Sequence, residues 1–376
     1  MSAAPKIAIA AGGTAGHVVP ALAVADALRA EGAEVAFVGG DRAEAELVPA
    51  AGYELHNLSV RGLSRSNPLR ALHAIGLAGA AVPRARAILR ELGVDAVLGG
   101  GGYVAGPAGL AALSLRLPLV LTEADSHLGL TNRLLAPRAR RVCLAFPLAG
   151  REGERYRVTG RPIPPVTGDR ASGRARFGLG EEETVVLVFG GSLGSRSINL
   201  ATLEAFASAP FTVLHVSGPR DYPALAAHDL RAGYHLLSYL DVADFGLALA
   251  AADLAVARSG GSVFELAAHG VPAILIPYPH AAGDHQSANA RWMADAGAAL
   301  VIADGELSAA RLGGEVAGLL ADTHRLRSMA AASRGLARPH AARDVAAEVL
   351  AAAAGSRPGR TAGETGGATG GAEAPR

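Results

Sequence analysis

Two segments of this chain, far apart in the sequence, share one pattern that constrains the fold. KIAIAAGGTAGH occupies residues 6–17, and TVVLVFGGSLGS occupies residues 184–195. In each, a short β-prone apolar run ends in Gly-Gly-Thr/Ser-x-Gly, and a stretch compatible with a helix follows. A strand, a glycine turn and a helix in this order open a doubly wound α/β domain. The duplication therefore predicts two Rossmann-like domains.

Further buried strands alternate with Ala/Leu-rich helical stretches in both halves. The strands are expected at 33–40, 95–102, 117–124 and 140–146 in the first half, and at 211–218, 235–240, 252–260 and 271–279 in the second. Alternating β and α elements favour parallel sheets. Residues 158–169, VTGRPIPPVTGD, are dense in proline and glycine. They cannot continue either sheet and are expected to link the domains.

The length and composition are typical of a soluble two-domain protein. The chain has 376 residues, 18% of them charged, with a net charge of +1, which gives no global nucleic-acid signature. The single cysteine, Cys143, excludes a disulfide framework and indicates a reducing compartment. Neither a secretion signal nor an apolar run of roughly 18 residues is present. We therefore expect a cytoplasmic protein without a nucleic-acid partner.

Each glycine turn is suited to binding phosphate, because it aims backbone N–H groups and the positive end of a helix dipole at a ligand. A purely structural tight turn is the simpler alternative. A dehydrogenase with Asp41 as the ribose-binding acid is another. However, Asp41 lies farther along the chain than the usual spacing of roughly 20 residues. A dinucleotide site also gives no role to His17 or to the second turn.

Six motifs occur in order within about residues 6–350. They are GGTAGHVVPALAVADAL (12–28), GGYVAGPAGLAA (101–112), LTNRLLA (130–136), GGSLGSRSIN (190–199), RSGGSVFELAAHGVPAILIPYPHAAGDHQSANA (258–290) and DAGAA (295–299). Together they resemble the MurG family of peptidoglycan glycosyltransferases, in glycosyltransferase family 28. That family moves N-acetylglucosamine from UDP-GlcNAc onto undecaprenyl-diphospho-N-acetylmuramoyl-pentapeptide (lipid I) and so makes lipid II.

The resemblance implies the α/β GT-B architecture, in which two Rossmann-like doubly wound domains face each other across a cleft. Residues 1–160 would form an N-terminal domain that faces the acceptor and the membrane. Residues 161–340 would form a C-terminal domain that binds UDP-GlcNAc. Residues 341–354 are expected to form a C-terminal helix. Residues 355–376 contain almost no large apolar residue and are expected to be a disordered tail.

The resemblance also implies roles for individual residues. His17 would take the proton from the acceptor's sugar 4-hydroxyl, because an imidazole with a pKa of roughly 6.5 can act as a base at neutral pH. Glu265 would bind the two ribose hydroxyls, since a carboxylate presents two acceptors. The other implied substrate-binding residues are Thr14, Ala15 and Gly16 near the sugar or lipid diphosphate; Gly261, Ser262, Val263 and Phe264 around uracil and diphosphate; Ser192 near the diphosphate; Leu240 at the base; His285 and Gln286 at the sugar; and Asp125 and Arg161 in the donor site.

Three positions depart from the family's pattern. The HEQN loop of the family is TEAD here (122–125), so Asp125 replaces an asparagine and is an acceptor only when ionised. The GNPVR segment is GRPIP (160–164), which moves the arginine from the position of Pro164 to Arg161. The loop before Glu265 is one residue shorter. These departures concern individual donor contacts, not the fold or the reaction class.

Neither a metal nor a cofactor is expected. The chain has no D-x-D triplet, and its closest carboxylate pair, Glu123 and Asp125, fits a strand-end loop better than a cation site. Enzymes of this architecture generally use N–H groups and helix dipoles in place of a metal. The implied partners are UDP-GlcNAc, lipid I and proteins of cell-wall synthesis.

A lipid-linked acceptor implies peripheral attachment to the cytoplasmic side of the cell membrane. Residues 61–93 combine arginines with apolar side chains, as interfacial segments do. The residues concerned are Arg61, Arg65, Arg70, Arg84, Arg86 and Arg90 with Leu69, Leu72, Ile75, Leu77 and Val82. An ordinary core helix with a solvated arginine face is the alternative.

Two other functions remain open at this point. One is a related GT-B transferase with another lipid or natural-product acceptor. The other is a nucleotide-sugar epimerase, which needs no acceptor and transfers nothing.

Overall fold

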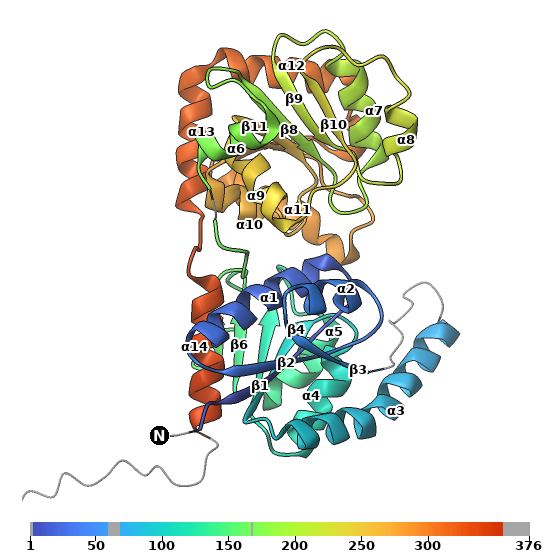
Figure 1. The fold of residues 1–376 in the computed structure, drawn as a ribbon, viewed down its shortest axis with the longest axis vertical. Helices are drawn as coiled ribbons and strands as arrows, with labels where there is room; N and C mark the ends of the chain where they lie inside the picture. Colours follow the sequence, from blue (N-terminus) through green and yellow to red (C-terminus); the bar gives the residue numbers. More distant parts are fainter. Residues whose placement is uncertain (1–2, 59–67, 167, 356–376) are drawn as a thin grey trace, which may run out of the picture.

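The computed structural model describes residues 3–58, 68–166 and 168–355, and gives the backbone alone at 68–79 and 282. The predicted tail lies outside the described residues except for Gly355, as do Arg61 and Arg65. Figure 1 shows two α/β domains, one above the other, with the last helix, α14, running down beside the N-terminal domain.

The N-terminal domain contains a parallel sheet, whose order in the described residues is β3-β2-β1-β4-β5-β6-β7. Its strands are β1 (Lys6–Ala11), β2 (Glu34–Gly39), β3 (Glu54–Asn57), β4 (Ala96–Gly101), β5 (Leu119–Glu123), β6 (Arg141–Leu144) and β7 (Tyr156–Val158). Its helices are α1 (Ala15–Ala30), α2 (Ala43–Ala50), α3 (Pro68–Leu92), α4 (Ala105–Ser114), α5 (Leu130–Leu135) and the 3₁₀ turn η1 (Ala136–Arg138).

The C-terminal domain contains a second parallel sheet, of order β10-β9-β8-β11-β12-β13 in the described residues. Its strands are β8 (Val185–Phe189), β9 (Thr212–Val216), β10 (Tyr234–Leu237), β11 (Leu254–Ala257), β12 (Ala273–Leu275) and β13 (Ala299–Val301). Its helices are α6 (Arg170–Phe177), α7 (Arg196–Ala205), α8 (Tyr222–Leu225), α9 (Val242–Ala251), α10 (Val263–His269), α11 (His285–Asp295), α12 (Ala309–Ala321) and α13 (Thr323–Gly335), with 3₁₀ turns η2 (Ala282–Asp284) and η3 (Asp304–Glu306).

The two sheets confirm the prediction of two Rossmann-like domains. Every strand predicted from an apolar run is present, although most are shorter than the run. The sequence missed β3, β7 and β13, and all three lie at sheet edges. Edge strands are only partly covered, so they lack the continuous apolar run of a buried parallel strand.

The order of strands fixes where ligands can bind. In each sheet the chain first builds outward on one side and then crosses to the other, between β1 and β4 and between β8 and β11. The loops that follow these strands diverge at such a switch point, and the crevice between them is the usual binding place in doubly wound folds. Both glycine turns lie at these points.

The C-terminal helix α14 (Ala341–Ala354) belongs structurally with the first domain. Val345 and Val349 are fully buried in the same core cluster as Ile7 and Ile9 of β1. At the edge, the Glu348 carboxylate pairs with Arg141 at 2.8 Å and with Arg157 at 3.1 Å. The end of the chain therefore packs against its beginning, and the polypeptide crosses between the domains twice.

We predict that Val349→Asp destabilises the N-terminal domain by about 3 kcal/mol or more, because an unpaired carboxylate would enter an apolar core. Ala351→Asp adds the same charge on the exposed side of α14 and should change the free energy of unfolding by no more than about 0.5 kcal/mol. Urea unfolding followed by circular dichroism measures both. Equal effects of the two variants would contradict the docking of α14.

Candidate active site

His17 lies at the switch point of the first sheet, in the first turn of α1. Its ring lies over the end of β4, where a Cβ built on Gly101 would be 2.8 Å from Nδ1. Burial, followed by the Arg161 charge, lowers the pKa of His17 below 6.5, and the carboxylates of Asp125 and Glu44 only partly oppose this. The imidazole is therefore neutral near pH 7, as a general base must be.

Pro20 explains how Arg161 reaches this place. Proline has no N–H, so inside α1 it leaves the carbonyl of Gly16, four residues earlier, without its helical donor. Arg161 Nη2 donates to that carbonyl at 2.5 Å. A residue of the interdomain linker is thus anchored on the helix that carries His17.

The same guanidinium also touches the second domain. A Cβ built on Gly261 would lie 2.6 Å from Arg161 Cζ, so only glycine permits this approach. Burial raises the pKa of Glu265, and the Arg161 charge opposes the rise. Arg161 therefore lies between His17 on one domain and Glu265 on the other.

The first glycine turn does not present all its N–H groups to the cleft. The Gly13 N–H is donated to Glu44 at 2.8 Å, and the Gly40 N–H and the Tyr103 hydroxyl are donated to the same carboxylate at 2.9 and 2.6 Å. Burial alone would raise the pKa of Glu44, but these hydrogen bonds hold it below its ordinary value. The protein's own carboxylate thus engages the Gly13 N–H, whereas no acceptor is found among the described residues for the N–H groups of Thr14, Ala15 and Gly16. Phosphate binding by this turn stays a prediction.

The remaining predicted residues of the first turn lie at its rim. Thr14 is the N-cap of α1 with an exposed side chain that makes no capping hydrogen bond. Ala15 is partly buried and Gly16 is exposed. These residues lie at the edge of the cleft beside His17.

The turn between β11 and α10 leads into the helix that carries Glu265. The N–H groups of Val263 and Phe264 are donated to the carbonyls of Gly260 and Gly261, and both side chains are buried in the core. No such acceptor is found for the N–H groups of Gly261 and Ser262 in the described part of the chain. The N–H groups of Gly261 and Ser262 therefore remain available, and Glu265 lies one turn further along α10.

Gln286 and His285 begin α11 beside this turn. The Tyr278 N–H is donated to Gln286 Oε1 at 2.9 Å, which fixes the orientation of the amide. The Ser259 hydroxyl is donated to the Gln286 carbonyl at 2.8 Å. Gln286 Nε2 thereby faces Gly260, where a Cβ would lie 3.9 Å from it. His285 lies close enough to His17 to contribute, as the smallest cause, to the lowering of the His17 pKa.

Ser192 and Leu240 lie farther from this group. Ser192 is exposed in the second glycine turn, beside Leu193, whose side chain is 68% exposed. Leu240 is partly buried against the core of the second domain. Among the described residues, neither Ser192 nor Leu240 forms a hydrogen bond or ion pair with His17, Arg161 or Glu265, and their roles stay predictions.

Asp125 owes its position to its neighbour Glu123, which is buried at the end of β5. The Glu123 carboxylate accepts hydrogen bonds from Gly129 N at 2.8 Å, Asn132 Nδ2 at 2.9 Å and Asp125 N at 3.1 Å. Burial raises the pKa of Glu123. The TEAD segment is thus a loop folded around Glu123, with Asp125 directed near His17 and Arg161.

Sequence reasoning gave no role to several of these supporting residues. Arg258 is buried before the glycine turn, pairs with Asp304 at 2.7 Å and donates to Ser197 at 2.9 Å. Asn289 Nδ2 donates to the Ser259 carbonyl at 3.0 Å, while its buried Oδ1 has no partner. Both lie in motifs that carried the resemblance. The sequence could have pointed to Arg258 and Asn289, because each is a polar residue within an otherwise apolar stretch.

Two family profiles and several known proteins are similar to this chain. The profile of the glycosyltransferase family 28 N-terminal domain matches residues 7–144, and that of the family 28 C-terminal domain matches residues 185–348. Two proteins named UDP-N-acetylglucosamine--N-acetylmuramyl-(pentapeptide) pyrophosphoryl-undecaprenol N-acetylglucosamine transferase are similar over nearly their whole length. The one from Alkalilimnicola ehrlichii is 45% identical, covering 90% of this chain and 97% of that protein. The one from Moorella thermoacetica is 41% identical, covering 89% and 96%.

A solved structure shows the same likeness in three dimensions. The crystal structure of MurG from Acinetobacter baumannii superposes with a TM-score of 0.73 at 30% identity, covering 93% of this chain and 100% of that one.

We predict that Arg161→Gln raises the pKa of His17, because it removes a nearby positive charge. Pro20→Ala should raise it too, since the new N–H at position 20 would compete with Arg161 for the Gly16 carbonyl. Histidine NMR titration measures the pKa. Arg133→Gln removes an exposed charge from α5 and is the control. An unchanged His17 pKa in Arg161→Gln would refute the coupling.

Proposed function

The chain belongs to glycosyltransferase family 28, and from this membership we propose that it moves N-acetylglucosamine from UDP-GlcNAc onto N-acetylmuramyl-pentapeptide pyrophosphoryl-undecaprenol. It is a hexosyltransferase. One observation carries the mechanism: a neutral His17 and a ribose-binding candidate, Glu265, lie on opposite domains with Arg161 between them. The product would be lipid II, a precursor in peptidoglycan and cell-wall synthesis.

The chemistry follows from the two sides of the cleft. His17 removes the proton from the acceptor's 4-hydroxyl as that oxygen attacks C1 of the donor sugar. The bond from C1 to the diphosphate oxygen breaks, the configuration at C1 inverts, and UDP leaves with the bonding electron pair. The N–H groups of Gly261 and Ser262, together with Arg161, are placed to stabilise the charge on the leaving diphosphate.

On the donor side, Glu265 holds the ribose hydroxyls. Its carboxylate is partly buried, so hydrogen bonds to it are stronger than in water. Gln286 offers its amide N–H group to the sugar, and Asp125 faces the same space from the first domain. Asp125 can only accept hydrogen bonds when ionised, and it can therefore bind sugar hydroxyls but not repeat the donor role of an asparagine.

The epimerase alternative is not favoured, because relatives that align over nearly the full length are named as transferases. A different lipid acceptor is disfavoured by the same names. An assay with radiolabelled UDP-GlcNAc, with and without a lipid I analogue, tests the reaction directly. Loss of label from the donor without the acceptor would reject transfer.

The membrane-facing surface belongs to the first domain in this proposal. Leu110 on α4 and Leu130 and Leu134 on α5 are 49%, 56% and 66% exposed. Arg133 and Arg138 are exposed beside them, and α4 packs between α5 and α3. Exposed leucines among arginines suit the headgroup boundary of an anionic leaflet.

The predicted membrane segment is described only in part. The side chains of Arg70, Leu69, Leu72, Ile75 and Leu77 lie outside the described residues, while Arg84 and Arg90 of α3 are exposed. Across the described ranges, no helix combines the length and the apolar character needed to cross a bilayer. We propose peripheral attachment to the cytoplasmic face of the cell membrane.

We predict that His17→Ala lowers turnover about 100-fold or more while UDP affinity stays nearly unchanged, because a base acts on the acceptor. Glu265→Ala should instead weaken UDP binding by about 1–3 kcal/mol through lost charge-assisted hydrogen bonds. In wild type the acid limb of kcat/KM should lie below pH 6.5, since the pKa of His17 is lowered. Calorimetry and steady-state kinetics measure these quantities. Parallel loss of UDP affinity and turnover in His17→Ala would reject its role as base.

We also predict that the protein sediments with vesicles containing anionic lipid, and that Leu134→Glu weakens this binding about tenfold. Leu200→Glu changes an equally apolar side chain, 50% exposed on α7 of the other domain, and should have no effect. Raised salt should weaken binding. Indifference to anionic lipid at low salt would refute this attachment.

A further inference from the structure

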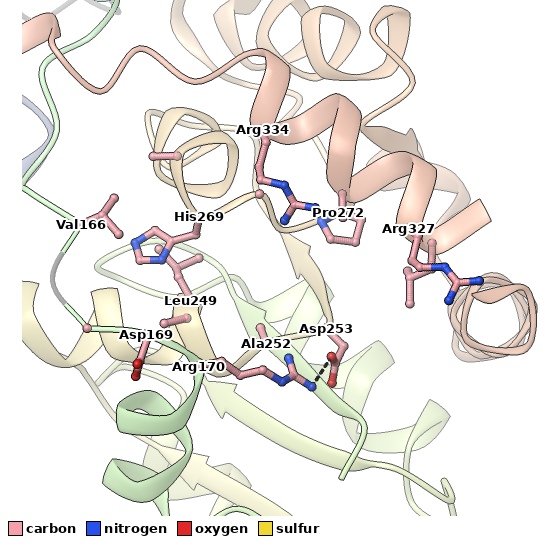
Figure 2. A pocket seen from close by; sticks show the side chains of 16 residues that line it. Val166, Asp169, Arg170, Leu249, Ala252, Asp253, His269, Pro272, Arg327 and Arg334 are labelled. Atoms are coloured by element: carbon pink, nitrogen blue, oxygen red, sulfur yellow. Dashed lines mark ion pairs between the residues drawn. The ribbon is translucent and has the colours of Figure 1, made fainter. Parts of the chain in front are cut away.

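A second hollow, of about 410 Å³, lies in the C-terminal domain away from His17 and Glu265 (Figure 2). The end of the linker, the start of α6, the last turns of α9 and α10, and one side of α13 form its walls. Its apolar lining includes Leu249, Ala252, Pro272 and Leu326. The proposed transfer reaction assigns no role to this hollow.

Two acidic residues, Asp253 and Asp169, lie at its wall. Asp253 forms ion pairs with Arg170 at 2.7 Å, drawn as a dashed line in Figure 2, and with Arg174 at 3.1 Å. It also accepts the Val185 N–H at 2.9 Å. The Asp169 carboxylate caps α6 by accepting the Ser172 N–H. The charge of Asp253 is thus neutralised, whereas Asp169 forms no ion pair within the described ranges and contacts only the start of α6.

Two arginines of α13 remain unpaired. Arg327 and Arg334 line the hollow, and no carboxylate lies within ion-pair distance of either guanidinium in the described ranges. Arg334 is held in place by close packing, since a Cβ built on Gly270 would lie 2.3 Å from its Cγ. Gly270 has a positive φ of 67° and ends α10. A side chain at this position would therefore displace Arg334.

His269, the last residue of α10, adds a hydrogen-bonding group. Burial lowers its pKa, so the ring is neutral near pH 7 and offers one donor and one acceptor. The hollow thus combines two unpaired guanidiniums, an imidazole and an apolar wall.

We propose that this hollow binds a small phosphorylated molecule, with Arg327 and Arg334 holding the phosphate and the apolar wall holding the rest. Guanidinium groups bind phosphate through paired N–H donors, and no carboxylate of the described ranges engages those of Arg327 and Arg334. A volume of about 410 Å³ is in the range of small-molecule sites. The site differs from the donor site, which lies at the other end of α10.

The test uses the full chain with UDP at saturation, so that the cleft is filled, and pyrophosphate as the probe in calorimetry. We expect one further saturable site. The double variant Arg327→Gln, Arg334→Gln should weaken it about tenfold or more. Arg325→Gln removes the same charge from α13 outside the hollow and should leave the affinity unchanged. Thermal melting curves check that each variant is folded.

Three outcomes would overturn the proposal. They are the absence of saturable pyrophosphate binding, an equal loss of affinity in Arg325→Gln, and loss of the site in Glu265→Ala, which would place the probe in the cleft. In a second experiment, phosphatidylglycerol vesicles replace pyrophosphate as the probe. Vesicle binding that needs Arg327 and Arg334, without pyrophosphate binding, would assign a lipid headgroup and reject a soluble ligand.

Discussion

The hydrogen bond from Arg161 to the Gly16 carbonyl connects the parts of the site. It exists because Pro20 cannot donate to that carbonyl, so a helix that would otherwise satisfy its own backbone keeps one acceptor open. The guanidinium that fills it stands between the base candidate and the donor-binding candidate. Because Pro20 lacks an N–H, Arg161 of the linker can contact both α1 of the first domain and the turn at Gly261 of the second domain.

The two glycine turns have similar sequences but different surroundings. In the first, Glu44 accepts the Gly13 N–H, while no acceptor is found among the described residues for the N–H groups of Thr14, Ala15 and Gly16. In the second, the Gly194 N–H is donated to the Gly191 carbonyl at 2.9 Å. A buried carboxylate held by three hydrogen bonds is costly to displace, because it would lose them all at once. The two turns therefore differ in how the protein itself engages their N–H groups, although both domains have the Rossmann-like fold.

Much of this was accessible from the sequence. The repeated strand-turn-helix pattern predicted both sheets, because buried parallel strands need continuous apolar runs and glycine turns need glycine. The edge strands β3, β7 and β13 were not predicted, because they lack such continuous apolar runs. Asp125, Arg161, Glu265 and Gln286 could be named from motifs, but their contacts could not, since a motif gives residue types and not the partners that folding supplies.

The sequence by itself determined the fold class, the family and the chemical types of the site residues, because these follow from local periodicity, glycine positions and motif order. Tertiary structure decided which side chain engages the first glycine turn, where α14 packs and what Arg161 touches. Glu44 is 31 residues from Gly13, and Arg161 is 145 residues from Gly16. Contacts over such separations depend on the packing of whole domains, and only the folded chain brings these groups within hydrogen-bonding distance.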